Sequence, residues 1–399
     1  MSAAEATAPL RVGPRKVLAV ACGAHALHDG YTDLIYVLLP IWQTEFALSY
    51  AALGILRMLY TGAMASLQMP ASILARRWGG AFVLASGTML AACAYLTIGF
   101  GGAGFTLLAA ALLVGGAGSA TQHPLASALV SRAFDEHGAR AALGTYNFSG
   151  DLGKMAIPAG VAWLLVVMPW RHAVGIVGAL GILVGVAVLV LLPRDLGSAR
   201  NVAAQVKIVA ASKPRGRIAF PLLLSIGVLD SGTRMGFLAF LPFVLKDKGA
   251  GFEGIGLALT LIFAGGALGK LACGLLGERL GVLLTVILTE GATALGILAM
   301  HWLPLIPSLA CLPLIGLALN GTSSVLYGTV PELVATEQRE KAFGLFYTGT
   351  IGAGAVAPFL YGMVGDAMGP INAIIVVAAV CLATVPLAVA LNPWLRQAT

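Results

Sequence analysis

Long apolar stretches separated by short polar connections make up almost the whole chain. Most of these stretches reach the roughly 20 residues that a helix needs to cross the hydrocarbon core of a bilayer. They lack the alternation of apolar and polar residues that barrel strands need, and open sheets cannot span lipid. The pattern therefore predicts an all-α membrane protein with twelve transmembrane helices, at residues 17–43, 52–74, 81–100, 104–131, 140–168, 172–193, 217–245, 254–276, 282–302, 306–332, 341–366 and 370–392.

The composition strengthens this prediction. Hydrophobic residues make up 59% of the chain and charged residues 10%, whereas soluble domains contain about 45–50% apolar residues. The 51 glycines and 19 prolines would weaken soluble helices. In a membrane bundle, small side chains let helices pack closely and neighbouring groups absorb the breaks. We therefore expect a lipid bilayer around the protein.

The formal net charge of +7 is concentrated in alternate loops. If the first residues and every second loop face the cytoplasm, most loop cations lie on that side, and Arg171, Lys246 and Lys248 lie on the other. The positive-inside rule then places both termini in the cytoplasm, which requires an even number of spans. We expect a multi-pass protein of the cell inner (plasma) membrane. No nucleic-acid partner is predicted, because the orientation accounts for the positive charge.

The two halves of the chain repeat each other. The least apolar stretch, Arg194 to Arg217, lies near the middle, and shifting one half by about 200 residues brings matching residues of the two halves into register. We predict two pseudo-symmetric six-helix bundles, at residues 1–193 and 217–399, joined by a cytoplasmic linker at 194–216. Carriers place their substrate sites between such repeats. The matches include the pairs Asp29 and Asp230, Pro40 and Pro242, Gly54 and Gly256, Arg77 and Arg279, and Pro158 and Pro358.

Two short loop motifs give the chain a family resemblance. The sequence Gly274-Leu-Leu-Gly-Glu278-Arg279-Leu-Gly281 fits the G-x-L-x-D-R-x-G loop of the major facilitator superfamily. In the first copy of this loop, Arg76 stands in the acidic position. Over its whole length the chain resembles that superfamily, which implies the major facilitator fold and alternating access between two bundles. The resemblance also implies a gating role for Arg77, Glu278 and Arg279.

Within the superfamily, the chain is similar to the fosmidomycin-resistance group of drug exporters. In that group Asn usually stands at the position of Asp151, which here is followed by Lys154. The resemblance implies efflux by a proton-coupled antiporter and a contribution to antibiotic resistance. It rests on three segments, His25-Ala-Leu-His28-Asp29-Gly-Tyr31, His123-Pro124 and Gly150-Asp151-Leu-Gly153.

Ionisable side chains near the middle of the spans are the main candidates for function, because such groups are costly in hydrocarbon and normally face a polar pathway. In the first span, His25, Asp29 and Asp33 are four residues apart and share one helix face. Two carboxylates at that spacing are not both cheaply ionised in a low dielectric. We predict that Asp29 couples transport to protons, with His25 and Asp33 assisting. The alternative is a purely structural hydrogen bond or ion pair.

Charges in two other spans have the spacing of ion pairs. Asp151 and Lys154 can pair within span 5, although Lys154 can alternatively reach Asp29, and Asp230 and Arg234 can pair within span 7. Substrate contact and structural pairing both stay open for Lys154 and Arg234. The predicted substrate-binding residues are Tyr31, Tyr36, Gln122, His123, Asn147, Asp151, Lys154, Asp230, Arg234, Asn320 and Tyr327.

Other polar residues receive no role in transport. Arg57 and Lys270 are predicted near the ends of spans 2 and 8, where their long side chains can reach the membrane interface. Glu290 lies midway along span 9, which is peripheral in the resembled fold, and it can pair with a neighbouring helix. The five isolated cysteines are expected to pack as small apolar residues.

The chain contains no phosphate-binding loop, nucleophile elbow or metalloprotease helix. We therefore predict no enzyme activity, no cofactor, no resident metal, and an ion gradient as the energy source. The leading hypothesis is a monomeric secondary active transporter that exports a small amphipathic or anionic compound in exchange for protons. The alternatives are proton-coupled uptake of an organic anion, a membrane receptor without transport, and a transition-metal carrier that uses His25, His28, Asp29 and Asp33.

Overall fold

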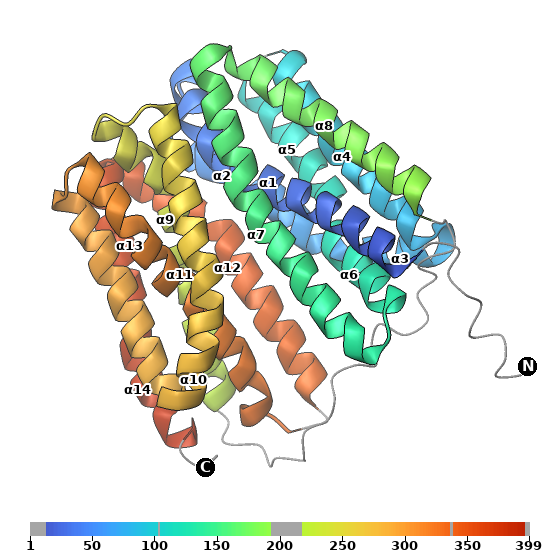
Figure 1. Cartoon of the computed structure of the whole chain (residues 1–399). Helices are drawn as coiled ribbons and strands as arrows, with labels where there is room; N and C mark the ends of the chain where they lie inside the picture. Colours follow the sequence, from blue (N-terminus) through green and yellow to red (C-terminus); the bar gives the residue numbers. More distant parts are fainter. Residues whose placement is uncertain (1–12, 103, 193–217, 336–337, 396–399) are drawn as a thin grey trace, which may run out of the picture.

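The computed structural model describes residues 13–102, 104–192, 218–335 and 338–395, and its secondary structure is helical (Figure 1). The predicted linker at 194–216 lies outside the described residues. The first half contains α1 (Pro14–Phe46), α2 (Tyr50–Ser66), α3 (Gln68–Trp78), α4 (Gly80–Phe100), α5 (Phe105–Ser119), α6 (Gln122–Ala133), α7 (Glu136–Val167) and α8 (Trp170–Leu191). The second half contains α9 (Ala219–Asp247), α10 (Phe252–Trp302), α11 (Leu305–Leu333), α12 (Arg339–Met368), α13 (Pro370–Leu382) and α14 (Thr384–Leu395).

These helices correspond to twelve spans, which confirms the predicted all-α membrane fold. Three spans are interrupted, namely α2 with α3, α5 with α6, and α13 with α14, while α10 covers two spans that meet at Gly281. Within the described residues, ten helical segments are long and apolar enough to cross a membrane, with α5 and α6 counted together, α13 and α14 counted together, and α10 counted as two. The first two spans fall outside that group because α1 carries His25, His28, Asp29 and Asp33 in its middle, and because α2 has 17 residues.

A proline follows each of the three interruptions, although α1, α7, α9, α11 and α12 contain prolines and stay continuous. A proline has no backbone N–H and cannot bond to the carbonyl four residues earlier. Pro70, Pro124 and Pro386 would bond to residues 66, 120 and 382, which lie at or next to the ends of α2, α5 and α13. The spans predicted as continuous at 52–74, 104–131 and 370–392 are therefore each built from two helices.

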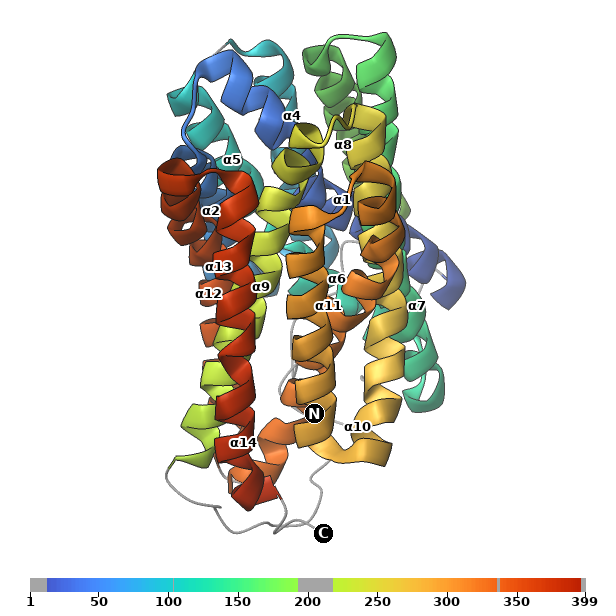
Figure 2. The ribbon, with the colours of Figure 1, turned by 90° about the vertical axis from the view of Figure 1, so that its left-hand side faces the viewer.

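The helices of each half pack mainly against one another, and Figures 1 and 2 show the two resulting bundles. In the first bundle α1 packs on α7, and α4 packs on α8. In the second bundle α10 packs on α11, and α9 packs on α12, α13 and α14. The bundles meet along two seams, where α2 contacts α12 and α7 contacts α10.

Both seams depend on a glycine at the equivalent place of the repeat. Gly54 of α2 faces the backbone of Pro358 in α12, and Gly256 of α10 faces Ala162 in α7. A methyl group on either glycine would collide with the facing atoms. The sequence repeat pairs Gly54 with Gly256, so the two seams are related in the way that duplicated bundles require.

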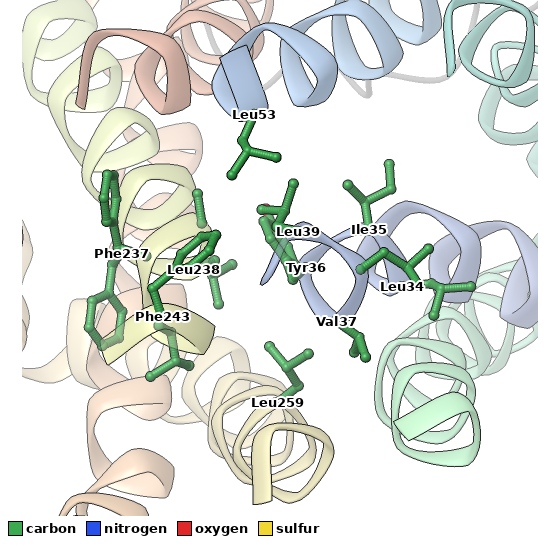
Figure 3. Packing of buried hydrophobic residues seen from close by; sticks show 14 of the residues in the cluster. Leu34, Ile35, Tyr36, Val37, Leu39, Leu53, Phe237, Leu238, Phe243 and Leu259 are labelled. Carbon is green, nitrogen blue, oxygen red and sulfur yellow. The ribbon is translucent and has the colours of Figure 1, made fainter. Parts of the chain in front are cut away.

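An apolar layer fills the space between the bundles at one end of the seams. Leu39 and Leu53 of the first bundle gather there with Phe237, Leu238 and Phe243 of the second (Figure 3). Each of these side chains is at most 4% exposed. Close packing of this kind leaves no path for water, so this layer closes one end of the interface.

A carboxylate fastens the same end. Asp366, near the end of α12, accepts hydrogen bonds from the backbone N–H groups of Tyr50 (2.6 Å) and Ala51 (3.1 Å) at the start of α2. The first N–H groups of a helix lack partners within it, and a negative charge there is favourable. Asp366 therefore caps a helix of the other bundle.

Candidate substrate cavity

A cavity of about 840 Å³ lies between the bundles. Its walls come from α1, α2, α3, α6 and α7 on one side and from α9 to α12 on the other. Asn147, Ser324 and Tyr327, which lie in the part of the lining far from the apolar layer, are exposed. The cavity thus opens toward the end at which α1 begins and α14 ends. Its size falls within the range of about 300–1,000 Å³ that is usual for sites of small molecules.

Charged groups of both signs line the cavity in equal number. Apolar and aromatic side chains such as Leu238, Phe263 and Phe346 complete the wall, so a solute with both polar and apolar parts would fit. Among the described lining residues, the four carboxyl groups belong to Asp29, Asp33, Asp151 and Asp230, and the four cations to Arg57, Lys154, Arg234 and Lys270.

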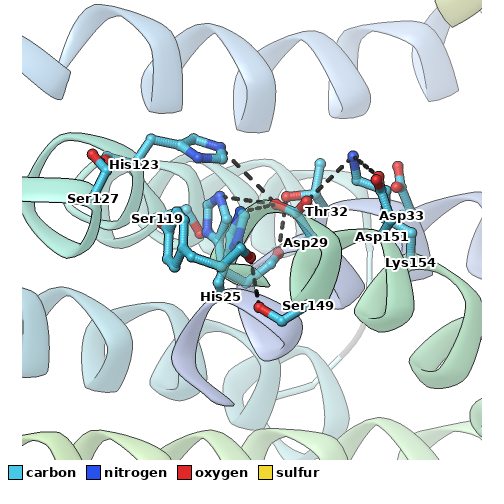
Figure 4. Close-up of polar contacts among 12 residues, drawn as sticks. His25, Asp29, Thr32, Asp33, Ser119, His123, Ser127, Ser149, Asp151 and Lys154 are labelled. Carbon is cyan, nitrogen blue, oxygen red and sulfur yellow. Dashed lines mark hydrogen bonds and ion pairs between the residues drawn. The ribbon is translucent and has the colours of Figure 1, made fainter. Parts of the chain in front are cut away.

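Alternating charges connect the two bundles across the cavity wall. Lys154 Nζ lies 3.2 Å from Asp29 Oδ2 and 3.6 Å from Asp151 Oδ1 (Figure 4). Lys270, from α10 of the other bundle, donates to both carboxylate oxygens of Asp151 at 2.7 and 2.9 Å. Both partners that the sequence allows for Lys154 are therefore in contact with it. The prediction that Lys270 reaches the membrane interface is wrong, because its ammonium group turns to the cavity.

Three imidazole rings point toward the other oxygen of Asp29 (Figure 4). The Nε2 atoms of His25, His28 and His123 lie 3.5, 3.8 and 4.0 Å from Asp29 Oδ1. His25 Nδ1 lies 2.8 Å from the Tyr146 carbonyl, which only accepts, so Nδ1 carries the hydrogen. His25 Nε2 then faces a carboxylate oxygen, and a favourable contact needs a proton on one of the two. This arrangement is suited to holding a proton.

Part of this cluster also has the spacing of metal ligands. The ligand atoms of His25, Asp29 and His123 lie within 4.8 Å of one another. The ammonium group of Lys154 contacts the same carboxylate, however, and its charge opposes that of a divalent cation. The transition-metal alternative therefore gains no support from this geometry.

A second ion pair lies deeper in the first bundle. Arg57 Nη2 is 3.9 Å from Asp33 Oδ1 and donates to the Tyr36 hydroxyl at 3.2 Å, while Nη1 donates to Thr61 at 2.6 Å. Arg57 is 2% exposed, so the prediction that it reaches the interface is wrong. Its guanidinium lies almost two turns inside α2, where Asp33 and Tyr36 supply polar partners.

The carboxylate of the second bundle has a different partner. Asp230 and Arg234 line the cavity, but among the described residues no cation lies within 4.0 Å of Asp230. The Asp230 carboxyl instead faces that of Glu290, which is 2% exposed. The predicted pair of Asp230 and Arg234 is therefore not formed. Glu290 interacts with neighbouring helices, as the sequence allows. α10 turns Glu290 inward, against α9 and α13.

The sequence profile of the major facilitator superfamily matches residues 21–229 and 223–396. The chain belongs to the major facilitator superfamily. A solved structure with this fold is a bacterial homologue of the human lysosomal transporter Spinster, inward-facing and occupied, with 17% identity and a TM-score of 0.74 over 98% of this chain and 97% of that chain. A mutant of the nucleoside transporter NupG has 13% identity and a TM-score of 0.76 over 96% and 99% of the two chains. No curated protein matches the sequence significantly.

Membership of the superfamily makes this protein a multi-pass membrane transporter rather than an enzyme, and its fold is that of secondary transporters that work by alternating access. Identities of this size show the fold alone. The similarity to fosmidomycin-resistance exporters therefore stays a prediction.

The predicted substrate-binding residues of this transporter do not all reach the cavity. Tyr31 donates its hydroxyl hydrogen to the Val177 carbonyl of α8 at 2.8 Å, and Tyr36 is fully buried beside Arg57. Gln122 is also buried and borders a separate small cavity. The residues that do line the central cavity are His123, Asn147, Asp151, Lys154, Asp230, Arg234, Asn320 and Tyr327.

The predicted gating residues lie at the open end. Arg77, Glu278 and Arg279 are exposed, and none of them forms an ion pair within 4.0 Å with another described residue. A latch between the helix ends on this side would engage when this end closes. Their role stays a prediction.

Proposed function

We propose that this transporter is a symporter of protons and a small organic anion, in which Asp29 binds the proton and Lys154 binds the anion. The main support is the ion pair between these two side chains on the cavity wall, 3.2 Å apart. His25, His28 and His123 surround the same carboxylate and provide a route by which a proton reaches it. Asp33 and Arg57 form the neighbouring pair.

Protonation of Asp29 changes what Lys154 can bind. While Asp29 is ionised, its charge holds the ammonium group of Lys154. Once Asp29 is neutral, Lys154 becomes a cation without a full counter-charge in a region where an unpaired charge is costly. An anion in the cavity then replaces the lost counter-charge. Proton and anion therefore favour each other's binding.

The charge balance of the lining supports the same coupling. Four carboxyl groups face four cations, and each proton taken up adds one positive charge to the cavity. A bound monovalent anion restores neutrality before the cavity moves across the membrane. The apolar part of the wall favours an anion with an aromatic or aliphatic body.

This logic favours uptake over the export predicted from the sequence resemblance. Export against protons requires that proton and substrate displace each other, as a cationic or zwitterionic compound would do at Asp29. Binding of both together instead moves them in one direction. With both termini in the cytoplasm of the cell inner membrane, the open end of the cavity faces the cytoplasm. One chain supplies the whole cavity wall, which supports a monomer.

Proteoliposomes with an imposed pH gradient test the proposal. The probes are radiolabelled shikimate, citrate and a phosphonate, with protein-free liposomes as the blank. We expect an acid exterior to drive accumulation of at least one probe. Asp29→Asn should lose this accumulation while it keeps exchange of labelled for unlabelled probe, because exchange needs no net proton movement.

Glu253→Gln is the matched control, since Glu253 is exposed in the first turn of α10, and it should behave like the wild type. An acid exterior that drives a preloaded probe outward would establish exchange instead of symport. Full gradient-driven accumulation by Asp29→Asn would show that another group carries the proton.

A further inference from the structure

A second group of buried polar side chains lies in the second bundle, and the proposed function does not use it. It is built from five helices and is almost inaccessible to solvent. Its members are Asp230 (3% exposed) on α9, Glu290 (2%) on α10, Thr322 (0%) on α11, Cys381 (0%) on α13 and Thr384 (0%) on α14.

The hydrogens of the neighbouring hydroxyl groups are already committed elsewhere. Thr322 donates to Thr289 at 2.7 Å, and Thr384 donates to the backbone carbonyl of Cys381 at 2.6 Å. Both hydroxyl groups lie beside Glu290, but each has one hydrogen, which these other acceptors already bind. The Cys381 thiol donates to Glu290 Oε2 at 3.0 Å.

The carboxyl group of Glu290 also faces that of Asp230. Both side chains are almost fully buried, and two ionised carboxylates side by side in a low dielectric would repel strongly. Ionised carboxylates are acceptors only, so a proton on one of the two groups would turn this repulsion into a hydrogen bond. Burial of the two acids together therefore favours one proton between them.

Few other charges face this pair. Arg234 lies one turn further along α9, but no ion pair of 4.0 Å or less joins it to either carboxyl group. Cys381 faces the pair from α13, and α11 and α14 contribute the uncharged Thr322 and Thr384. Among the described residues no cation lies within 4.0 Å of either carboxyl group.

We propose that Asp230 and Glu290 share one proton and form a second proton-binding site, which exchanges with the cavity through Asp230. Asp230 lines the cavity and Glu290 does not, so the proton enters and leaves at an Asp230 oxygen. On release, the O–H bond of Asp230 breaks and the proton passes to water in the cavity. The guanidinium of Arg234, one helical turn away, then pairs with the ionised Asp230.

The shared proton itself stands without the proposed function. Its release during transport rests on the proposal that the transporter is coupled to protons. With both proposals together, the transporter carries one proton site in each bundle, and the site at Asp29 and Lys154 responds to the anion.

Infrared spectroscopy of the purified transporter in detergent tests the shared proton directly. A protonated carboxylic acid has a C=O stretching band that an ionised carboxylate lacks. We expect the wild type to keep this band at alkaline pH, with the small shift in D₂O that an exchangeable O–H produces. Glu290→Gln should lose the band, because the amide donates to Asp230 and Asp230 becomes ionised.

Two further variants keep the test clear. Asp230→Asn should lose the same band, which covers the case in which Glu290→Gln fails to fold. Glu253→Gln removes an exposed carboxyl group from the same helix as Glu290 and should leave the band unchanged.

A hydrophobic carbodiimide offers an independent readout, since it modifies carboxyl groups that are protonated and buried. Mass spectrometry should find the adduct on the peptide of Asp230 or Glu290, and Glu290→Gln should lose it. Absence of the alkaline band and of the adduct from the wild type would overturn the proposal. Neither measurement depends on flux, so a failure of Asp29→Asn in the transport assay would count only against the proposed function.

Discussion

Asp29 and Asp230 occupy equivalent positions of the two halves, yet their surroundings have opposite chemistry. Asp29 contacts the ammonium of Lys154 and faces three imidazoles. Asp230 contacts the carboxyl group of Glu290, with a thiol behind it. A carboxylate that has a cation as its partner is stable when ionised. A carboxylate that has another carboxylate as its partner keeps a proton. Duplication has preserved the position of the acid, while its partner determines what it binds.

The repeat identifies the substitutions behind this difference. With the offset of 200 that pairs Pro158 with Pro358, Lys154 corresponds to Gly354. With the offset of 202 that pairs Arg77 with Arg279, Glu290 corresponds to Thr88. The first bundle therefore supplies a cation where the second supplies glycine, and the second supplies an acid where the first supplies a hydroxyl.

Removing the cation should have the largest effect. Lys154→Met leaves Asp29 without its ion-pair partner, and the loss of one member of a buried pair costs about 3–5 kcal/mol. Because each 1.4 kcal/mol is tenfold in an equilibrium constant, we expect gradient-driven transport to fall by about 100-fold or more. The measurement is gradient-driven uptake of the labelled probe by proteoliposomes.

A charge swap shows which role this pair has. If Asp29→Lys combined with Lys154→Asp restored transport, the pair would be structural and the anion would bind elsewhere. Lys154→Arg keeps the charge and should retain a measurable rate.

Crowding the Asp29 cluster should have an intermediate effect. A Cβ on Gly150 would lie 2.6 Å from Asp29 Oδ2 and from the His25 ring, whereas the second bundle already carries Thr350 at the equivalent place. Overpacking of this kind costs about 1–3 kcal/mol, so Gly150→Ala should lower the transport rate by about tenfold. Gly144→Ala on the same helix, where a Cβ meets open space, is the control and should have little effect. If both variants lost the same fraction of the transport rate, the effect would come from α7 in general and not from the Asp29 cluster.

A cation introduced into the second bundle should have the smallest effect on transport and the clearest effect on the proton shared by Asp230 and Glu290. Gly354→Lys places an ammonium in the second bundle at the position that Lys154 has in the first. A Cβ at this position meets the side chains of Ser231 and Met235, which can shift. We expect the infrared band of the shared proton to disappear while transport falls only a few-fold, as expected for about 1 kcal/mol. If the infrared band remained in Gly354→Lys, the charge of the partner side chain alone would not explain the difference between Asp29 and Asp230.

The sequence predicts those features that depend on local pattern. Helical spans, the repeat and the stripe of His25, Asp29 and Asp33 follow from apolar length and helix periodicity. The sequence prediction places Tyr31 in the cavity. Tyr31 lies two residues after Asp29 and therefore on nearly the opposite face of the helix, which is the local signal that places it against α8. Pro70, Pro124 and Pro386 have no backbone N–H group, which is also a local signal near the three interruptions.

Contacts between helices have no such signal. Glu290 appears isolated in an apolar span, and its partners on α9 and α13 lie some 60 and 91 residues away in the chain. Arg57 likewise acquires its partner only when α2 packs beside α1. The rotation of each helix in the bundle determines these pairs, and a single apolar sequence leaves that rotation open.

The cap that Asp366 provides for α2 has a consequence for the solution that bathes the closed end. When this end opens, the N–H groups of Tyr50 and Ala51 lose a carboxylate and turn to the surrounding solution. Chloride or sulfate can then occupy the vacant helix start and hold that end apart. Turnover should therefore respond to the identity of the salt on that side of the membrane at constant ionic strength, and an Asp366→Asn transporter should respond less. Identical rates in chloride and in a bulky organic salt would exclude this dependence.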